Sequence, residues 1–189
     1  MAGRWSQGAA TAARSRRELL RLGLGVALGS VGVPALGRAT SASDRRVTLY
    51  AIHTGEAVSV EYVVGGRYCP DALEAVSRVL RDHRTGEIHP VDPGVLDVLH
   101  EVAALVESRA AFHVVCGFRS ATTNEWKWRH GGGVARNSLH RYGRAVDVFL
   151  PGCELDGLRR AALRLGAGGV GYYPRSGFVH LDTGPVRSW

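Results

Sequence analysis

The sequence predicts an α+β fold, in which helices pack against a mostly antiparallel β-sheet. Two β-rich segments that alternate between apolar and polar residues lie together at residues 45–64, and two more lie together at residues 168–185. Between these pairs, two helical segments, two further strands and one more helix follow in turn. Neighbouring strands joined by short turns pair antiparallel, and the 189-residue length suits one such domain with a short extension.

The first half of the domain contains a hairpin and two helices. "RRVTLYAIH" and "AVSVEYVV" are joined by the turn "HTGE", and "GGRYCP" predicts a further turn. Apolar residues then recur at helical spacing over residues 71–84. Asp92 is a favoured N-cap and Pro93 suits a first helical position, so a second helix is expected over residues 93–109.

The second half alternates strands with loops and one helix. "AFHVVCGFRS" predicts a strand that breaks at Gly117, and "ATTNEWKWRHGGGVARNS" predicts a helical turn followed by a glycine-rich loop. "YGRAVDVFLP" is a strand ended by Pro151, and residues 154–165 form a helix. The segments "GGVGYYP" and "GFVHLDTGP" are two short strands with a tight turn between them.

The positive charge of the chain lies mostly in its first 42 residues. The chain has a formal charge of +7, and residues 1–42 hold six arginines and one glutamate, which leaves +2 for residues 43–189. A basic surface is the electrostatic signature of a nucleic-acid-binding domain, and the domain carries little of this excess. We therefore expect no nucleic-acid partner.

The N-terminal extension resembles a twin-arginine export signal. Arg16 and Arg17 precede an apolar, glycine-rich stretch that ends in small residues, and cleavage after Gly37 or Ala42 is consistent with this composition. An amphipathic helix or a membrane anchor is the alternative, but Arg21 and the repeated glycines disfavour a span of about 20 apolar residues. We expect residues 1–42 to be signal and linker, recognised by the twin-arginine export machinery. Residues 43–189 then form a domain without a stable membrane span, in the periplasm or cell-wall space.

Three cysteines, Cys69, Cys116 and Cys153, show no spacing typical of a cysteine zinc site. At most one internal disulfide can form, and at least one thiol stays free. Cys116 lies in the apolar run "HVVCGF" and is expected to be a small buried hydrophobe.

Two strands place histidine and aspartate on faces that oppose an apolar face. In "YGRAVDVFLP", Gly143, Ala145 and Asp147 alternate with core-type residues, so small side chains leave room beside a carboxylate, and His140 precedes this strand. In "GFVHLDTG", His180 and Asp182 share one face. Two histidines and one carboxylate suit Zn²⁺ and leave a fourth position for water. The remaining histidines are expected to be surface or structural residues: His53, His83, His89, His100, His113 and His130.

The segment "SLHRYGRAVDV" resembles the S-x-H-x-x-G-x-A-x-D signature of the zinc D-Ala-D-Ala carboxypeptidase superfamily, whose zinc-site architecture hedgehog domains share. The closer resemblance is to murein endopeptidase K-like proteins, and it extends through "LYAIHTGE", "RDHRTGEIHPVDP", "CGFRSATTN", "GGGVARNSLH" and "AGGVGYYPRSGFVHLDTGPVRSW". It implies zinc held by His140, Asp147 and His180. It also implies that the partners are the peptide stems of peptidoglycan, with their cross-links as the target.

The sequence departs from this superfamily at the general base. Many relatives carry a glutamate three residues before the last zinc histidine, and that position here is Gly177. Asp182 shares the site face with His180 and is a candidate base. It is equally suited to capping the "DTGP" turn or to orienting His180, so both roles stay open. Otherwise zinc alone must activate the water.

Three residues are candidates for contact with the substrate. Arg119 and Ser120 lie at a strand end and resemble the substrate-side arginine of the relatives and its neighbour. An arginine there suits a substrate carboxylate or the tetrahedral oxyanion, so Arg119 is also a candidate catalytic residue. Tyr142 is a candidate at the border of the cleft. Three tryptophans are candidates for lining a groove that binds the wall or for packing: Trp126, Trp128 and Trp189.

The predicted function is a zinc-dependent peptidoglycan endopeptidase that hydrolyses peptide cross-links of the bacterial cell wall. Two alternatives stay open. A D,D- or L,D-carboxypeptidase would remove a terminal residue, and a non-catalytic zinc-stabilised domain would only bind the wall.

Overall fold

A computed structural model describes residues 44–131 and 133–189. An eight-stranded sheet with the order β3-β2-β1-β4-β5-β7-β6-β8 forms its centre. The strands are β1 (Arg45–Ala51), β2 (Glu56–Val64), β3 (Arg67–Tyr68), β4 (Phe112–Cys116), β5 (Ala145–Phe149), β6 (Gly169–Tyr173), β7 (Phe178–Asp182) and β8 (Arg187–Ser188). The pairs β1–β4 and β6–β8 are parallel and the other pairs are antiparallel, so the predicted α+β class with a mostly antiparallel sheet is confirmed.

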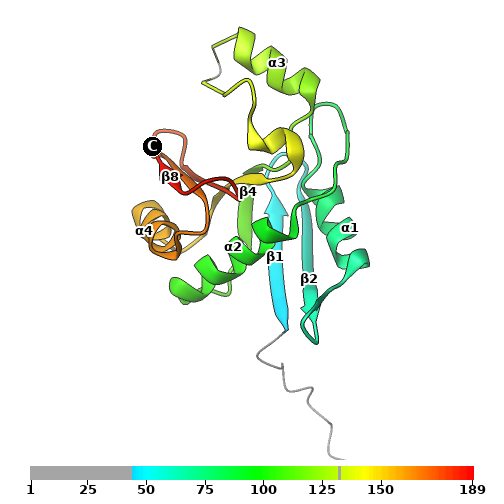
Figure 1. Cartoon of the computed structure of the whole chain (residues 1–189), viewed down its shortest axis with the longest axis vertical. Helices are drawn as coiled ribbons and strands as arrows, with labels where there is room; N and C mark the ends of the chain where they lie inside the picture. Colours follow the sequence, from blue (N-terminus) through cyan, green and yellow to red (C-terminus); the bar gives the residue numbers. More distant parts are fainter. Residues whose placement is uncertain (1–43, 132) are drawn as a thin grey trace, which may run out of the picture. The chain divides into compact units, whose positions relative to one another are not determined.

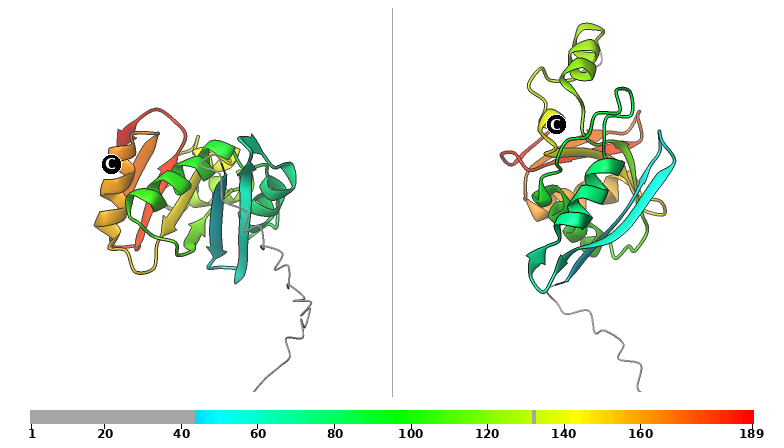
Figure 2. Two further views of the ribbon diagram at one scale, coloured as in Figure 1. Left: turned by 90° about the horizontal axis from the view of Figure 1, so that it is seen from below. Right: turned by 90° about the vertical axis from the view of Figure 1, so that its right-hand side faces the viewer.

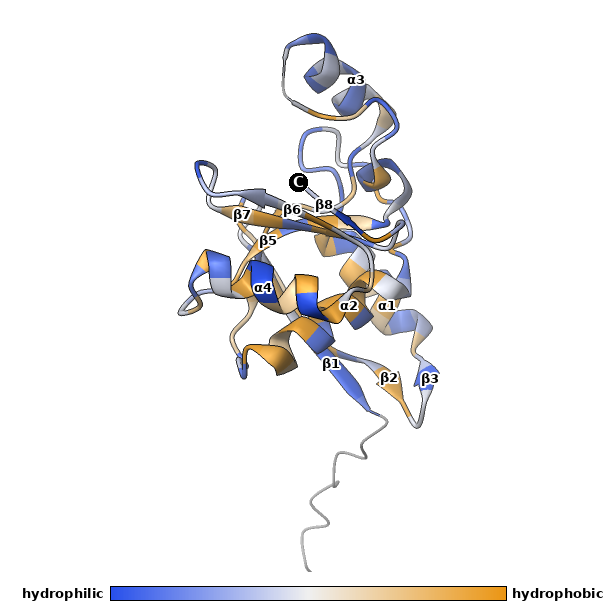
Figure 3. Cartoon of the chain, turned by 60° about the vertical axis from the view of Figure 1, so that its left-hand side comes forward, coloured by the Kyte–Doolittle hydropathy of each residue, from blue (hydrophilic) through white to orange (hydrophobic). Residues whose placement is uncertain are grey.

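Helices cover one face of the sheet. The helices are α1 (Pro70–Val79), α2 (Pro93–Leu105), α3 (Ala121–Arg129) and α4 (Leu155–Leu165), with a 3₁₀ helix η1 (Leu139–Tyr142) before β5. Helix α1 packs on β1 and β2, α2 on β1 and β7, and α4 on β6 and β7. Figures 1 and 2 show α3 well away from these three helices, and Figure 3 shows it beyond the opposite face of the sheet, rich in hydrophilic residues. That opposite face is therefore free for a functional site.

Strand alternation assigns each side chain of β5 and β7 to one of the two faces. Val146 and Val148 of β5, with Val179 and Leu181 of β7, are fully or almost fully buried in the core against the helices. The other face of the same strands carries the polar residues Asp147, His180 and Asp182 together with Ala145, Phe149 and Phe178. Because successive side chains of a strand point to opposite faces, the same two strands contribute to the hydrophobic core on one face and to a more polar surface on the other.

Several element boundaries differ from the prediction. Helix α1 ends at Val79 and not near residue 84, because the Leu80 carbonyl accepts a 2.7 Å hydrogen bond from the Phe118 amide. Helix α2 begins after Asp92, which caps Gly94 as predicted, but it ends at Leu105. The short strands β3 and β8 and the helix η1 were not predicted, since two to four residues carry no measurable periodicity.

Gly143 plays a different role from the one the sequence suggested. It ends η1 with φ +63°, and an added Cβ would lie 2.3 Å from the Pro90 carbonyl oxygen. The prediction that Gly143 shares a strand face with Asp147 is therefore wrong, because β5 begins at Ala145. Glycine is needed here to bring η1 against the chain before α2.

The predicted export signal and the boundary near residue 42 lie outside the described residues. Among the described residues, no helix is long and apolar enough to cross a membrane.

Candidate metal centre and its cleft

Three side chains predicted from the sequence converge on one point of the free sheet face. His140 comes from η1, Asp147 from β5 and His180 from β7, and the register of the sheet pairs Asp147 directly with His180. His140 Nε2 lies 3.2 Å from Asp147 Oδ1 and 3.2 Å from His180 Nδ1, and His180 Nδ1 lies 2.8 Å from Asp147 Oδ1. All three residues are buried.

The spacing of these donor atoms fits a metal ion. Ligands at 2.0–2.1 Å from a tetrahedral Zn²⁺ are about 3.3 Å apart. The two 3.2 Å separations match this spacing, and the 2.8 Å contact between His180 and Asp147 is somewhat shorter. The second nitrogen of each imidazole has another partner: His140 Nδ1 donates to the Gly117 carbonyl at 2.7 Å, and His180 Nε2 donates to Asp182 at 2.9 Å. The remaining nitrogen of each ring therefore faces the common centre, and it offers a lone pair there once its proton is displaced, as in metal-binding histidines.

His140 and Asp147 carry opposite charges in the metal-free site. Burial by itself lowers the pKa of His140, but the ionised Asp147 and the nearby Cys116 outweigh it and raise that pKa to about 10. Burial likewise raises the pKa of Asp147, and His140 and His180 overcome this and hold it below its usual range. A cation therefore compensates Asp147 at neutral pH, and a metal ion can take over that role by displacing the proton.

Asp182 supports His180 from the side of the ring that faces away from the centre. Its Oδ2 accepts from His180 and, at 2.6 Å, from Arg187, while its Oδ1 accepts from the amides of Gly169 and Gly184 at 3.0 and 2.8 Å. Burial raises the pKa of Asp182, but these hydrogen bonds from His180, Arg187 and the two amides overcome it and hold the pKa well below the usual range. The carboxylate has no free oxygen facing the centre, so the geometry favours the orienting role over that of general base.

Cys116 lies inside the site, which the sequence did not predict. Ligand atoms of Cys116, His140 and Asp147 all lie within 4.8 Å of one another, so the thiol borders the metal centre from β4. Its placement in an apolar run suggested a simple core residue, and only the bulge between β4 and β5 pairs it with Asp147. All three cysteines are free.

Arg119 lines the cleft three residues after the end of β4. Only 4% of the residue is exposed, and its Nη2 lies 3.4 Å from Cys116 Sγ and 3.8 Å from Asp147 Oδ2. Asn124 accepts from its Nη1 at 3.3 Å, and its Nε is buried without a protein partner. A buried guanidinium with spare donors beside the metal centre suits an anionic group of a bound molecule.

Ser120 and Tyr142 lie elsewhere. Ser120 is fully buried, caps α3 through the amide of Thr123 and donates to Asp82 at 2.7 Å. Tyr142 is 48% exposed and does not line the cleft, because it follows His140 by two residues in η1 and points away. The geometry therefore supports neither residue as a contact of the substrate.

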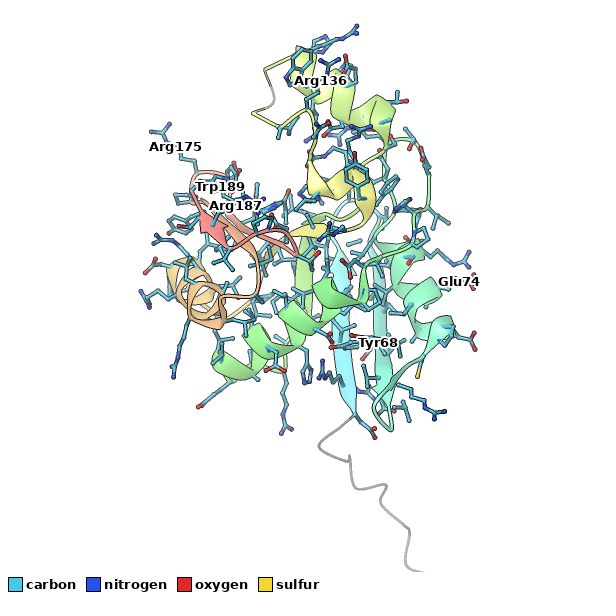
Figure 4. The ribbon with its side chains drawn as sticks, viewed as in Figure 1. Tyr68, Glu74, Arg136, Arg175, Arg187 and Trp189 are labelled. Carbon is cyan, nitrogen blue, oxygen red and sulfur yellow. The ribbon has the colours of Figure 1, made fainter. Side chains whose placement is uncertain are left out.

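A cleft of about 570 Å³ opens above the metal centre. Its walls include Trp189, whose ring lies 5.2 Å from that of His180, and the stacked pair His53 and His83. Trp126 and Trp128 are exposed outside it. Figure 4 shows Arg187 and Trp189 close together on the C-terminal strand. His53 and His83 were predicted to be surface or structural residues, and their place in this cleft could not be predicted because they lie far along the chain from His140, Asp147 and His180.

Gly177 occupies the position where many members of the wider superfamily carry a glutamate. It lies in the turn between β6 and β7 with φ +74°, and its amide donates to the Tyr173 carbonyl at 2.9 Å. A left-handed conformation favours glycine over a glutamate. Among the described residues that line the cleft, Asp147 and Asp182 are the only carboxylates.

The fold and the donor set are those of a metal-dependent peptidase, the class that the sequence resemblance implies. Residues 39–189 match the family described as peptidoglycan L,D-endopeptidase MepK, and the chain belongs to this family. The peptidoglycan L,D-endopeptidase MepK of Escherichia coli K12 is 42% identical over 177 residues, which is 93% of this chain and 97% of the relative. The probable peptidoglycan L,D-endopeptidase MepK of Haemophilus influenzae is 38% identical over 179 residues, covering 93% and 96%. The predicted resemblance is thereby confirmed.

Proposed function

We propose that this chain is a zinc-dependent peptidoglycan endopeptidase that hydrolyses L,D-configured peptide cross-links. The convergence of His140, Asp147 and His180 at the ligand spacing of a tetrahedral metal site is the observation that carries the zinc assignment. Kinship with peptidoglycan L,D-endopeptidases along 93% of the chain supports the substrate and the bond.

His140, Asp147 and His180 would hold the ion. Zinc bound there supplies a Lewis acid for the scissile carbonyl and lowers the pKa of a bound water to about 7. Gly117 and Asp182 fix the orientation of the two imidazoles through their second nitrogens. Arg119 donates to the substrate oxygen that becomes negative during attack, or to a neighbouring carboxylate.

Among the described residues that line the cleft, no carboxylate is free to accept the proton of the attacking water. Asp182 is assigned to orienting His180, since Arg187 and two amides already occupy its oxygens. We propose that zinc, if bound here, would lower the pKa of the attacking water enough for its proton to pass to solvent, so that this chain needs no dedicated glutamate.

The site of action follows from the substrate. Peptidoglycan lies outside the cytoplasmic membrane, so we propose that the protein works in the periplasm or the cell-wall space. The twin-arginine signal predicted in residues 1–42 would deliver it there through the corresponding export machinery.

Digestion of purified peptidoglycan tests the activity. Cross-linked muropeptide dimers, followed by mass, should fall to monomers when the zinc-loaded protein is added, and His140→Ala and His180→Ala should abolish both zinc and cleavage. Loss of a terminal residue from monomers would instead identify a carboxypeptidase, and intact muropeptides that stay bound would identify a binding domain. A zinc content far below one ion per chain after zinc supply would refute the metal assignment.

A further inference from the structure

The cleft contains more positive charge than the metal centre explains. Its charged walls include the cations Arg84, Lys127 and Arg187 besides Arg119, and Asp147 and Asp182 are the acids among the described lining residues. Arg187 is paired with Asp182 at 2.6 Å, and Asp147 faces the two histidines. Arg84 and Lys127 are the two cations of the cleft that this pairing does not include.

These two cations have no acidic partner. Within residues 44–131 and 133–189, neither side chain has a carboxylate within 4.0 Å or a side-chain hydrogen bond. Arg129, two residues further along α3, pairs with Glu125 at 2.8 Å, so acids are available on the same helix. Partial burial is the largest cause that lowers the pKa of Lys127, and repulsion from Arg119 and Arg84 lowers it further. An anion that binds between Arg84 and Lys127, in what we call the cationic corner of the cleft, would relieve that repulsion.

Hydrogen bonds to Asp82 fix the two segments that carry Arg84 and Lys127 in the ligand-free structure. The Asp82 carboxylate accepts from the Arg84 amide at 2.9 Å and from the Ser120 amide at 2.9 Å. Asp82 is 2% exposed, and its contact with Ser120 joins the loop that carries Arg84 to the start of the helix that carries Lys127. Such preorganisation lowers the entropy lost when a ligand binds.

We propose that Arg84 and Lys127 form a second anion subsite, which binds a free carboxylate of the stem peptide beside the scissile bond. This inference rests on the proposed function for the identity of the ligand. Arg119 lies next to the metal centre and serves the reacting group, whereas Arg84 and Lys127 serve the free carboxylate beside it. The stacked rings of His53 and His83, at 4.2 Å between centroids, add a flat wall to the same cleft.

A pair of synthetic cross-linked peptides tests the subsite. One keeps the free carboxylates beside the cross-link, and in the other these are amidated. For the wild type we expect kcat/KM to favour the free acid by about 10- to 150-fold, the range of one charge-assisted contact. In Lys127→Gln and Arg84→Gln this preference should fall toward one, while Lys127→Arg should retain it. Arg129→Gln, a matched change on α3 outside the cleft, should keep the full preference.

Different results would exclude the proposed anion subsite and the proposed endopeptidase function. Equal kcat/KM for both peptides in the wild type, or a preference that survives both glutamine variants, would exclude the subsite while cleavage persists. If the wild type cleaves neither peptide, the proposed function fails, and calorimetric binding of the two uncleaved peptides then decides the subsite. If the wild type binds the free-acid peptide more tightly and Lys127→Gln loses this difference in affinity, the subsite is upheld. Equal affinity of the wild type for both peptides would exclude the subsite.

Discussion

At the scale of single residues, Asp182 defines how His180 meets the metal centre. One oxygen of the carboxylate holds His180 Nε2, so Nδ1 is the nitrogen that faces Asp147 and His140. Arg187 and the amides of Gly169 and Gly184 fix the carboxylate in turn. The chain of contacts from Arg187 through Asp182 to His180 therefore sets both the tautomer and the angle of one proposed ligand.

Replacing Asp182 separates its two possible roles. Asp182→Asn removes the charge that orients His180, so we expect zinc affinity to fall by about 10- to 100-fold and activity to recover in part with excess zinc. Competition with a chromophoric chelator measures the affinity. A general base would behave differently, because the variant would then bind zinc normally and stay inactive at any zinc concentration.

At the scale of elements, Asp82 ties the loop after α1 to the beginning of α3. It accepts from the hydroxyl and amide of Ser120 and from the amide of Arg84. Burial raises the pKa of Asp82, but hydrogen bonds from Thr123, Ser120 and the Arg84 amide outweigh it, so the folded-state pKa lies below the unfolded value of about 3.9. The stabilisation is thus complete above about pH 4 and is lost as the pH falls through the folded-state value.

Asp82→Asn should remove this acid-sensitive contribution. At neutral pH we expect a loss of about 1–3 kcal/mol in the free energy of unfolding, because the hydrogen bonds to a charged acceptor are weakened. The difference from the wild type should shrink below about pH 4. Urea unfolding at several pH values measures it, and Asp71→Asn, an exposed carboxylate at the start of α1, is the control. A difference that is constant with pH would contradict the assignment.

The contact between β6 and the C-terminus depends on one glycine. A Cβ added at Gly171 would lie 2.7–2.9 Å from atoms of the Trp189 indole, and the indole Nε1 donates to Tyr173 at 2.7 Å. Trp189 in turn lies against His180 in the cleft wall. The absence of a side chain at Gly171 therefore permits the tryptophan to reach the site.

Gly171→Ala should displace the indole from the cleft wall. We expect a shift of the Trp189 fluorescence and a rise in KM with zinc content close to one ion per chain. Gly157→Ala in α4 is the matched control, because its new Cβ would meet nothing closer than 3.7 Å. That control should gain about 0.5–1 kcal/mol of stability through the better helix propensity of alanine. Unchanged fluorescence and KM in Gly171→Ala would show that Trp189 does not form this wall.

At the scale of the whole domain, the proposed metal links segments that are distant in the sequence. His140 belongs to η1, Asp147 to β5 and His180 to β7, and the last is 40 residues from the first. An ion that binds only the folded arrangement stabilises it by mass action, about 2.7 kcal/mol at 100 times its dissociation constant.

Removing the metal should lower the melting temperature. For a domain of this size we expect a fall of roughly 5–10 °C after chelation, reversed by adding zinc. Differential scanning fluorimetry measures the shift. His140→Ala, in which the donor set is incomplete, should melt at the same temperature with and without zinc, and a zinc-dependent shift in that variant would place the ion elsewhere.

Much of the fold could be predicted from the sequence because its signals are local. Alternation in Arg45–Ala51 and Glu56–Val64, and the Asp92–Pro93 start of α2, depend on neighbours along the chain. The end of α1 could not be predicted, because the Phe118 amide that captures the Leu80 carbonyl comes from a segment 38 positions later. The positions of Cys116 and Tyr142 relative to the cleft could not be predicted for the same reason, because they depend on contacts with distant segments of the chain.

The residues of the proposed site could be chosen from sequence patterns and from the family resemblance. The alternation that puts Asp147 and His180 opposite the core follows from strand geometry, whereas His140 was chosen because it precedes the strand and because the resemblance to the peptidase family implies it. The tertiary structure decided what these residues face. The register of β5 with β7 pairs Asp147 with His180, and the turn at Gly143 brings His140 over them. It also decided that Asp182 faces His180 and Arg187, and that Lys127 and Arg84 share the cleft, since such contacts depend on distances between segments that no local pattern encodes.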